Sequence, residues 1–382
     1  MERLNIRLLK QESVKAYVCT EIIGKAEGCV AGCFSPSGEY LALGKSCGEV
    51  IIYCFLTHSI IQRRLLCKAK AKVLSITWKE KIYVLTDANF LYTMSLEEDL
   101  DEPLQFDFKT SGMQIQGRKV LVFGKSDVVL ADLDSKSIVS LKQDRTTTEW
   151  FGCFYKDSYL VTFGTPNNKF YLTDTQGNLI HSQEVSYVFQ SAVRNFSHNS
   201  ENLFLLNSRD RLLRLFEVKE EPWEFVLKKE IGDYIEKKRW SACCFFKTQP
   251  DSPYFVLACL QETGSHTLKM FDTVEHQSRV SLAKNMHSPL GSASFLCYSL
   301  NTHIHPLICV VTQAGSVLLW SSGTFLKVEK WSTSLGIPNF VELEEGNVEY
   351  AEKEDEFDEV ANSSTTLDLN PTPTPAPFRL KF

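Results

Sequence analysis

The first 335 residues are made of short apolar or alternating runs that are bounded by Gly, Asn, Asp and Pro. Alternation with a period of two is typical of β-strands, and no long stretch has the 3.6-residue period of an amphipathic helix. Residues 33–44 predict two strands joined by a Pro-Ser-Gly turn, and residues 49–53 predict a third strand. A fourth strand before the next unit would complete one sheet. The pattern therefore predicts an all-β fold of repeated four-stranded sheets.

The pattern recurs at intervals near the roughly 40 to 45 residues of a WD-type blade, and the intervals lengthen late in the chain. The third strands are expected to end near Tyr53, Tyr92, Leu130, Leu172, Phe216, Phe271 and Trp320. The innermost strands are expected over residues 73–78, 150–154, 240–246 and 294–298. No Trp-Asp dipeptide occurs, so the prediction of a seven-bladed WD40-type β-propeller over residues 1–335 rests on strand rhythm. We expect a strand around residues 4–9 to close the ring, because an open sheet edge invites mispairing.

The composition changes after the last predicted blade. From residue 336 onward there are eleven Asp or Glu and three Lys or Arg, a net charge of −8, whereas the whole chain carries −6. Residues 336–360 are therefore expected to form an acidic, partner-binding segment. Residues 361–382 are rich in Pro and Thr and cannot bury enough apolar area to offset the entropy of ordering, so we expect this part of the acidic tail to be disordered.

The sequence carries no convincing catalytic motif. Gly44-Lys45-Ser46 and Gly124-Lys125-Ser126 resemble the end of a phosphate-binding loop, but the glycine required five residues earlier is replaced by Glu39 and Lys119. Nucleophile-elbow, zinc-protease and dinucleotide-binding motifs are also missing. We expect both Gly-Lys-Ser segments to be turns, and the protein to be non-catalytic and to need no cofactor.

The twelve cysteines are spread over a long chain without paired ligand spacing. Several lie in apolar runs, such as Cys33, Cys153, Cys259 and Cys309, and we expect them to be reduced core residues. Cys243 and Cys244 are adjacent and would point to opposite faces of a strand. The nearest approach to a ligand cluster is His303 and His305 with Cys309, and we predict no metal site.

The first residues lack the apolar core of a signal peptide, and no run approaches the roughly 18 apolar residues of a membrane span. We therefore expect a soluble intracellular protein without a membrane contact.

The chain resembles the retinoblastoma-binding-protein-5-like, or Swd-one-like, WD-repeat subunits of SET1/MLL (COMPASS) complexes, which methylate lysine 4 of histone H3. The resemblance is carried by residues 44–62, 210–216, 233–245, 315–320 with Trp331 and Ser332, and above all 340–358. The last of these is an acidic hinge with Asn-Val-Glu-Tyr and Glu-Phe-Asp directly after the ring. The resemblance implies a nuclear scaffold subunit.

The resemblance also implies two contacts made by the post-propeller segment. The residues that would lie against the catalytic SET domain are Phe340, Glu342, Glu344, Asn347, Val348 and Glu349. The residues that would bind the SPRY domain of the Ash-two-like subunit are Tyr350, Glu352, Glu354, Asp355, Glu356, Phe357 and Asp358. Independently, carboxylates with two interleaved aromatic rings suit a basic groove, because charge speeds encounter and buried rings slow release.

Two further contacts follow from the resemblance. The basic residues Arg211, Lys237, Lys238 and Arg239 match a stretch that faces nucleosomal DNA in the family, although two other basic positions of that face are lost near Gly264 and Pro289. Exposed charges beside a blade turn are an equally good interpretation. Residues 367–369 fit poorly to the motif that docks the small WD-repeat adaptor subunit.

Other functions stay open at this point. The acidic segment would be a solubilising tail if its aromatic residues were incidental. The chain would then be a generic WD-repeat adaptor, for example of a ubiquitin ligase. A propeller enzyme would require a catalytic carboxylate in the central channel.

Overall fold

The structure is a computed structural model that describes residues 17–322, with gaps at 26–27, 56, 58, 67–70, 98–99, 142–143, 145, 186–192, 199–201, 209–210, 233–238, 248–253, 262, 274–281, 289–292, 300–306 and 313–315. The chain divides into two compact units, Met1–Gly336 and Ile337–Phe382. The described residues all belong to the first unit. The predicted acidic segment at 336–360 and the tail at 361–382 lie outside them.

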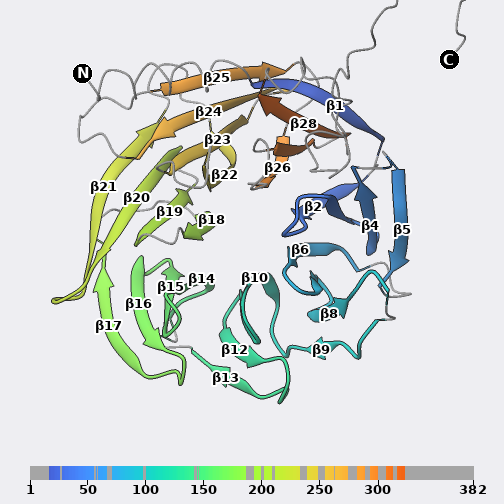
Figure 1. Cartoon of the computed structure of the whole chain (residues 1–382). Helices are drawn as coiled ribbons and strands as arrows, with labels where there is room; N and C mark the ends of the chain where they lie inside the picture. Colours follow the sequence, from blue (N-terminus) through green and yellow to red (C-terminus); the bar gives the residue numbers. More distant parts are fainter. Residues whose placement is uncertain are drawn as a thin grey trace, which may run out of the picture. The chain divides into compact units, whose positions relative to one another are not determined.

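The described strands form seven four-stranded antiparallel sheets that follow one another around a ring (Figure 1). Blade 1 contains β2 (Cys29–Phe34), β3 (Tyr40–Lys45), β4 (Glu49–Cys54) and β5 (Ser59–Leu65). Blade 2 contains β6 (Val73–Trp78), β7 (Ile82–Thr86), β8 (Phe90–Met94) and β9 (Leu104–Gln105). Blade 3 contains β10 (Thr110–Gln116), β11 (Lys119–Gly124), β12 (Val128–Asp132) and β13 (Ile138–Ser140).

The other four blades repeat this order. Blade 4 contains β14 (Glu149–Tyr155), β15 (Tyr159–Thr165), β16 (Lys169–Asp174) and β17 (Leu179–Glu184). Blade 5 contains β18 (Val193–His198), β19 (Leu203–Ser208), β20 (Leu212–Lys219) and β21 (Glu224–Gly232). Blade 6 contains β22 (Trp240–Phe246), β23 (Phe255–Gln261), β24 (His266–Asp272) and β25 (Leu282–Ser288). Blade 7 contains β26 (Ala293–Ser299), β27 (Leu307–Thr312), β28 (Ser316–Ser322) and β1 (Tyr17–Lys25).

The seven-bladed β-propeller predicted from strand rhythm is confirmed. Each residue at which a third strand was expected to end lies in the third strand of its sheet, β4, β8, β12, β16, β20, β24 or β28. Each expected inner strand coincides with β6, β14, β22 or β26. In blade 1, the Pro-Ser-Gly turn places Gly38 at φ 77°, a left-handed conformation that glycine adopts without steric cost. Both Gly-Lys-Ser segments lie between paired strands, at the ends of β3 and β11.

The predicted position of the closing strand is wrong. The outer strand of blade 7 is β1, which pairs antiparallel with β28 in a register that joins Tyr17 to Ser322 and Lys25 to Ser316. Residues 4–9 lie outside the described part of the chain. The principle of closure by an N-terminal strand holds, because β1 covers the edge that β28 would otherwise leave open.

Apolar clusters fill the spaces between neighbouring blades. One cluster joins blades 3, 4 and 5, and includes the fully buried Trp150 and the rings of Phe170 and Phe225, which stack 4.5 Å apart. Others lie between blades 5 and 6 and between blades 6 and 7, and these receive Cys243 and Cys244 respectively. The two adjacent thiols therefore point to opposite faces of β22, as the alternation predicts.

The ten cysteines whose side chains the structure describes form no disulfide. Cys153, Cys259 and Cys309 are buried as expected, whereas Cys33 is only partly buried. Burial raises the pKa of the Cys153 thiol well above its usual value, so this residue stays protonated and behaves as a small apolar side chain. In the described part of the chain there is no helix with the length and apolarity that a bilayer crossing requires.

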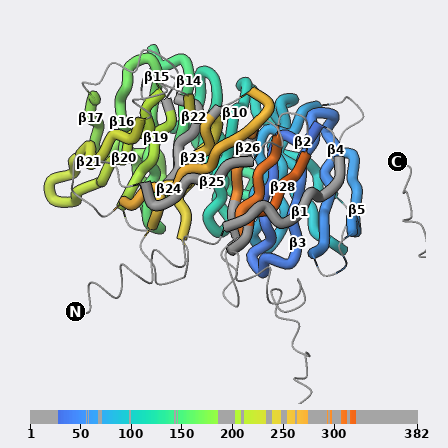
Figure 2. The backbone as a smooth tube through the Cα atoms, turned by 90° about the horizontal axis from the view of Figure 1, so that it is seen from above, coloured from blue at the N-terminus to red at the C-terminus, as the bar shows by residue number. Residues whose placement is uncertain are grey.

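The blades give the ring two distinct faces, seen edge-on in Figure 2. The turns from the first to the second strand and from the third to the fourth strand lie on one face, here called the first face. The turns from the second to the third strand, and the connections between blades, lie on the opposite or second face. This follows from the antiparallel order of every sheet.

Candidate functional site

Some of the predicted binding residues lie in the described part of the chain, and others lie outside it. The predicted SET-domain and SPRY-domain contacts at 340–358 lie outside the described residues, as do Lys237, Lys238, His303 and His305. Of the predicted DNA contacts, Arg211 and Arg239 are described, and both are exposed.

The structure brings Arg211 and Arg239 to the junction of blades 5 and 6 on the second face. Arg211 lies in the turn between β19 and β20 with φ 74°, and Arg239 directly precedes β22. Between them, the buried Trp240 donates a hydrogen bond from Nε1 to the carbonyl oxygen of Arg211 over 3.1 Å. Two exposed guanidinium groups from segments 28 positions apart therefore share one surface, here called the arginine pair.

A neighbouring arginine has a different role. Arg214 is 5% exposed, and its Nε atom contacts Glu230 Oε1 at 2.8 Å. This ion pair joins β20 to β21 and neutralises the buried guanidinium. Of these three arginines, only the arginine pair is exposed to a polyanion such as a phosphate backbone. Such a contact is independent of base sequence and sensitive to salt.

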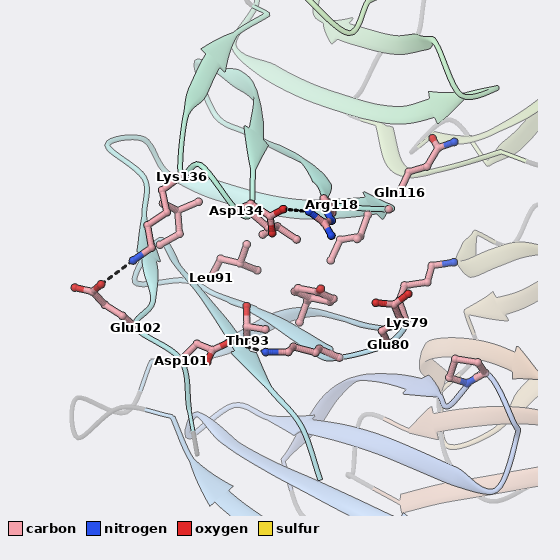
Figure 3. A pocket seen from close by; sticks show the side chains of 17 residues that line it. Lys79, Glu80, Leu91, Thr93, Asp101, Glu102, Gln116, Arg118, Asp134 and Lys136 are labelled. Atoms are coloured by element: carbon pink, nitrogen blue, oxygen red, sulfur yellow. Dashed lines mark hydrogen bonds and ion pairs between the residues drawn. The ribbon is translucent and has the colours of Figure 1, made fainter. Parts of the chain in front are cut away.

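A concave surface lies on the first face, between blades 2 and 3. It is a cleft of about 1210 Å³ (Figure 3). Its floor is apolar or aromatic and contains Tyr83, Leu91, Leu104, Ile115 and Leu133. Its rim carries Lys79, Glu80, Lys81, Asp101, Glu102, Arg118, Asp134 and Lys136.

The rim charges pair with one another. Lys81 Nζ lies 3.2 Å from Asp101 Oδ2, and Lys136 Nζ lies 2.7 Å from Glu102 Oε2, which joins blade 3 to blade 2. Arg118 forms a third pair with Asp134. The paired side chains are between 40% and 81% exposed. Exposed pairs of this kind each contribute about 0.2–1 kcal/mol and exchange readily for the charges of a ligand.

Two groups of the cleft have shifted pKa values. The bond from Lys136 lowers the pKa of the Glu102 carboxyl, which is therefore ionised at neutral pH. Burial raises the pKa of the Tyr83 hydroxyl, which is therefore protonated. Neither group is a base with a pKa near neutrality.

Sequence reasoning missed the cleft. Its rim residues occupy ordinary strand-connecting turns, and their concavity arises only when blades 2 and 3 are placed side by side. Charged residues in each of these turns, such as Lys79-Glu80 and Asp101-Glu102, are the hint that the sequence offers. No cluster of three or more His, Cys, Asp or Glu with the arrangement of a metal site occurs among the described residues.

Comparison with known proteins gives relatives along most of the chain, although no protein-family model matches it. COMPASS component SWD1 of Saccharomyces cerevisiae is 26% identical over 361 residues, covering 86% of this chain and 80% of the relative. The Retinoblastoma-binding protein 5 homolog of Drosophila melanogaster is 25% identical over 372 residues, covering 88% and 68%. Protein RBL of Arabidopsis thaliana is 29% identical over 253 residues, covering 57% and 42%.

A solved structure has the same fold. The β-propeller domain of Cps50 (Swd1) from Myceliophteria thermophila superposes with a TM-score of 0.66 at 15% identity, covering 80% of this chain and 99% of that domain. At this identity the likeness concerns the fold alone. The similarity to two relatives over most of this chain supports a Swd1-like, retinoblastoma-binding-protein-5-like WD-repeat protein.

Proposed function

We propose that the chain is the Swd1-type scaffold subunit of a COMPASS-type complex that methylates lysine 4 of histone H3 in the nucleus. The observation that carries the proposal is the similarity over 80% of the length of a relative named as a COMPASS component. A closed ring of seven sheets supports a scaffolding role, because such a ring offers rigid surfaces and needs grafted residues for any chemistry.

The chain contributes no catalytic group in this proposal, and it acts on a SET-domain subunit that performs the methyl transfer. The acidic segment is the activating element. Phe340, Glu342, Glu344, Asn347, Val348 and Glu349 contact the SET domain and shift its population toward the active arrangement. Tyr350, Glu352, Glu354, Asp355, Glu356, Phe357 and Asp358 bind the SPRY domain of the Ash-two-like subunit.

The chemistry of residues 350–358 supports this assignment. Five carboxylates offer charge-assisted hydrogen bonds to a basic groove, and Tyr350 and Phe357 supply aromatic area that can be buried. Interfaces of this kind depend on a few buried anchors, so most of the binding free energy is expected at the two rings.

The arginine pair provides the surface that would face nucleosomal DNA. Arg211 and Arg239 are exposed on one face, and the Trp240 hydrogen bond holds the turn that carries Arg211. Lys237 and Lys238 precede Arg239 in the sequence and would extend the positive charge. The small WD-repeat adaptor subunit would complete the complex.

The experiment is a pull-down of the isolated SPRY subunit by the full chain, followed by methylation of histone H3 by the reconstituted complex. Phe357→Ala, and separately Glu354→Lys with Glu356→Lys, should abolish both SPRY binding and stimulation. The matched control for Phe357→Ala is Phe378→Ala, which removes a ring from the same end of the chain outside the proposed contacts. All variants should keep the thermal midpoint of the propeller.

Two outcomes would refute the proposal. One is unchanged SPRY binding and methylation by the Phe357→Ala and double-lysine variants. The other is purification of the endogenous protein with a different assembly, such as a ubiquitin ligase, and without a SET-domain subunit. The second outcome would favour the generic adaptor function.

A further inference from the structure

The outer strand of blade 1, β5 (Ser59–Leu65), exposes more large apolar side chains than a water-facing strand normally does. Ile60, Ile61 and Leu65 are 39%, 46% and 57% exposed. The strand is seven residues long, whereas the outer strands of blades 2 and 3 have two and three residues. It lies at the circumference of the ring (Figure 1). Natural proteins usually shorten, charge or cover such an edge.

The register with β4 (Glu49–Cys54) assigns the side chains of β5 to two faces. Ile60, Arg63 and Leu65 lie opposite Tyr53, Ile51 and Glu49. Gln62 and Arg64 lie opposite Ile52 and Val50, which pack toward blade 2. A bulge leaves Ile61 without a partner residue on β4. The two arginines therefore flank the edge on opposite faces of the sheet.

The charge of Arg63 is only weakly compensated. Its guanidinium is 58% exposed, and its Nη1 atom lies 3.9 Å from Glu49 Oε1. The same carboxylate is held at 2.5 Å by Lys45 Nζ. An exposed pair at 3.9 Å contributes little to stability, so Arg63 can bind an external carboxylate at small cost.

The outer edge of β5 is also open to backbone pairing. In the described sheet of blade 1, β5 has β4 as its neighbour on one side and no strand on the other. The edge of a strand presents N–H and C=O groups to which an extended peptide adds as a further strand, with alternate side chains giving specificity.

We propose that the β5 edge is a docking site for an extended segment of a partner protein that carries a carboxylate with an apolar residue two positions away on each side. On the face that holds Ile60, Arg63 and Leu65, the carboxylate would pair with Arg63, and the two apolar side chains would cover Ile60 and Leu65. The inference is independent of the proposed function, because it uses no residue of the acidic segment or of the arginine pair.

Charge and apolar area together select this occupant. Nucleic acid would satisfy the arginines but would leave the three apolar side chains uncovered. A second copy of this chain, paired through the same edge, would bring two more arginines and no carboxylate of β5. A basic segment would be repelled. An acidic strand with apolar residues satisfies both features and the free backbone groups.

Another outer strand of the ring provides a contrast. β17 (Leu179–Glu184) exposes Leu179 and Ile180 by 47% and 41%, but it has no arginine, and its charged end is Glu184. Apolar exposure alone therefore occurs elsewhere on the circumference. The combination with two arginines is a property of β5 within the outer strands whose side chains are described, β5, β9, β13, β17 and β21.

The test uses the full chain and a fluorescein-labelled peptide, acetyl-Val-Thr-Glu-Thr-Val-Thr-amide, with binding measured by fluorescence anisotropy. The acidic peptide should bind about threefold more tightly than the same peptide with Lys in place of Glu, as expected for one exposed charge pair. Arg63→Glu with Arg64→Glu should reverse this preference. Methylation of alternate peptide nitrogens should weaken binding at least about tenfold through loss of the backbone pairing.

Arg118→Glu is the matched control, because it reverses the charge of an exposed arginine on the first face. It should leave peptide binding unchanged, and all variants should unfold at the wild-type midpoint. The proposal is overturned if the acidic peptide does not bind, if Arg118→Glu weakens its binding equally, or if the methylated peptide binds undiminished. It is also overturned if the Arg63 and Arg64 variant loses dimerisation or duplex-DNA binding of the wild type but still binds the peptide.

Discussion

Trp240 Nε1 and the carbonyl oxygen of Arg211 are joined by a hydrogen bond of 3.1 Å across the junction of blades 5 and 6. This bond satisfies a buried indole donor and holds the turn in which Arg211 has a left-handed backbone conformation. The core residue Trp240 thereby fixes the position of Arg211. Trp240 directly follows Arg239, the other member of the arginine pair.

Replacing Trp240 by Phe should remove this hydrogen bond together with some packing. Trp150 is an equivalent inner-strand tryptophan whose Nε1 atom has no hydrogen-bond partner among the described residues. Trp150→Phe therefore loses packing alone. Because a buried hydrogen bond contributes about 1 kcal/mol, the thermal midpoint should fall about 2 to 4 °C further in Trp240→Phe than in Trp150→Phe. Equal midpoints would show that the bond to Arg211 is energetically unimportant.

The arginine pair should bind DNA through phosphates. Arg211→Glu with Arg239→Glu should weaken binding of a short DNA duplex irrespective of its sequence. It should also reduce the slope of log affinity against log salt concentration by about 2, since two phosphate contacts are lost. Fluorescence anisotropy between low and physiological salt measures both quantities. Arg118→Glu on the first face serves as the control, and a similar loss in that variant would indicate a general charge effect instead.

Gly44→Ala should destabilise the contact between blades 1 and 2. A Cβ atom at this position would lie 2.4 Å from Val73 Cγ1 and 2.8 Å from Ile76 Cδ1. Overpacking of this kind costs about 1–3 kcal/mol, so the midpoint of urea unfolding should fall clearly. Gly117→Asn is the control, because its left-handed conformation suits Asn and no atom lies within 4 Å of the added Cβ. A normal midpoint for Gly44→Ala would mean that β6 moves away without cost.

Asp144 should make stability depend on pH. Its carboxyl accepts hydrogen bonds from the backbone N–H and hydroxyl of Thr146, from Asn167 and from Tyr171, and these bonds lower its pKa to about 2. A lowered pKa in the folded state means that the contribution is complete above the ordinary value of 3.8 and is lost as the pH falls toward 2.

The measurement is the difference in thermal midpoint between the wild type and Asp144→Asn. It should be constant from neutral pH to about pH 4.5 and should shrink as the pH falls further. Asp101→Asn, in the exposed pair with Lys81, gives the background for an ordinary surface carboxylate. A difference that does not change with pH would argue against the ionised carboxylate as the stabilising form.

Much of the fold was predictable because β-strands leave a local trace in the sequence. The alternation around Tyr53, Leu172 and Trp320 reflects sheets that are packed on both faces by neighbouring blades, so apolar positions recur at a fixed place in each unit. The closing strand was misplaced because its pairing with β28 spans almost the whole propeller. Local pattern does not distinguish residues 4–9 from β1 when the partner lies some 300 positions away in the chain.

The surfaces were less predictable for the same reason. Arg211 and Arg239 are individually ordinary turn residues, and their proximity depends on the Trp240 bond between two blades. The cleft between blades 2 and 3 depends on turns from both sheets, such as those carrying Lys81 and Arg118. By contrast, the β5 edge is visible in the sequence as an Ile-Ile pair followed by two arginines, although its position at the circumference is not.

The pairing of Tyr17 with Ser322 has a practical consequence for genetic dissection. N-terminal truncations made to map an interaction would remove the outer strand of the last sheet and expose the edge of β28. Loss of a partner in such a deletion series would then report a damaged scaffold, and point substitutions are the safer tool.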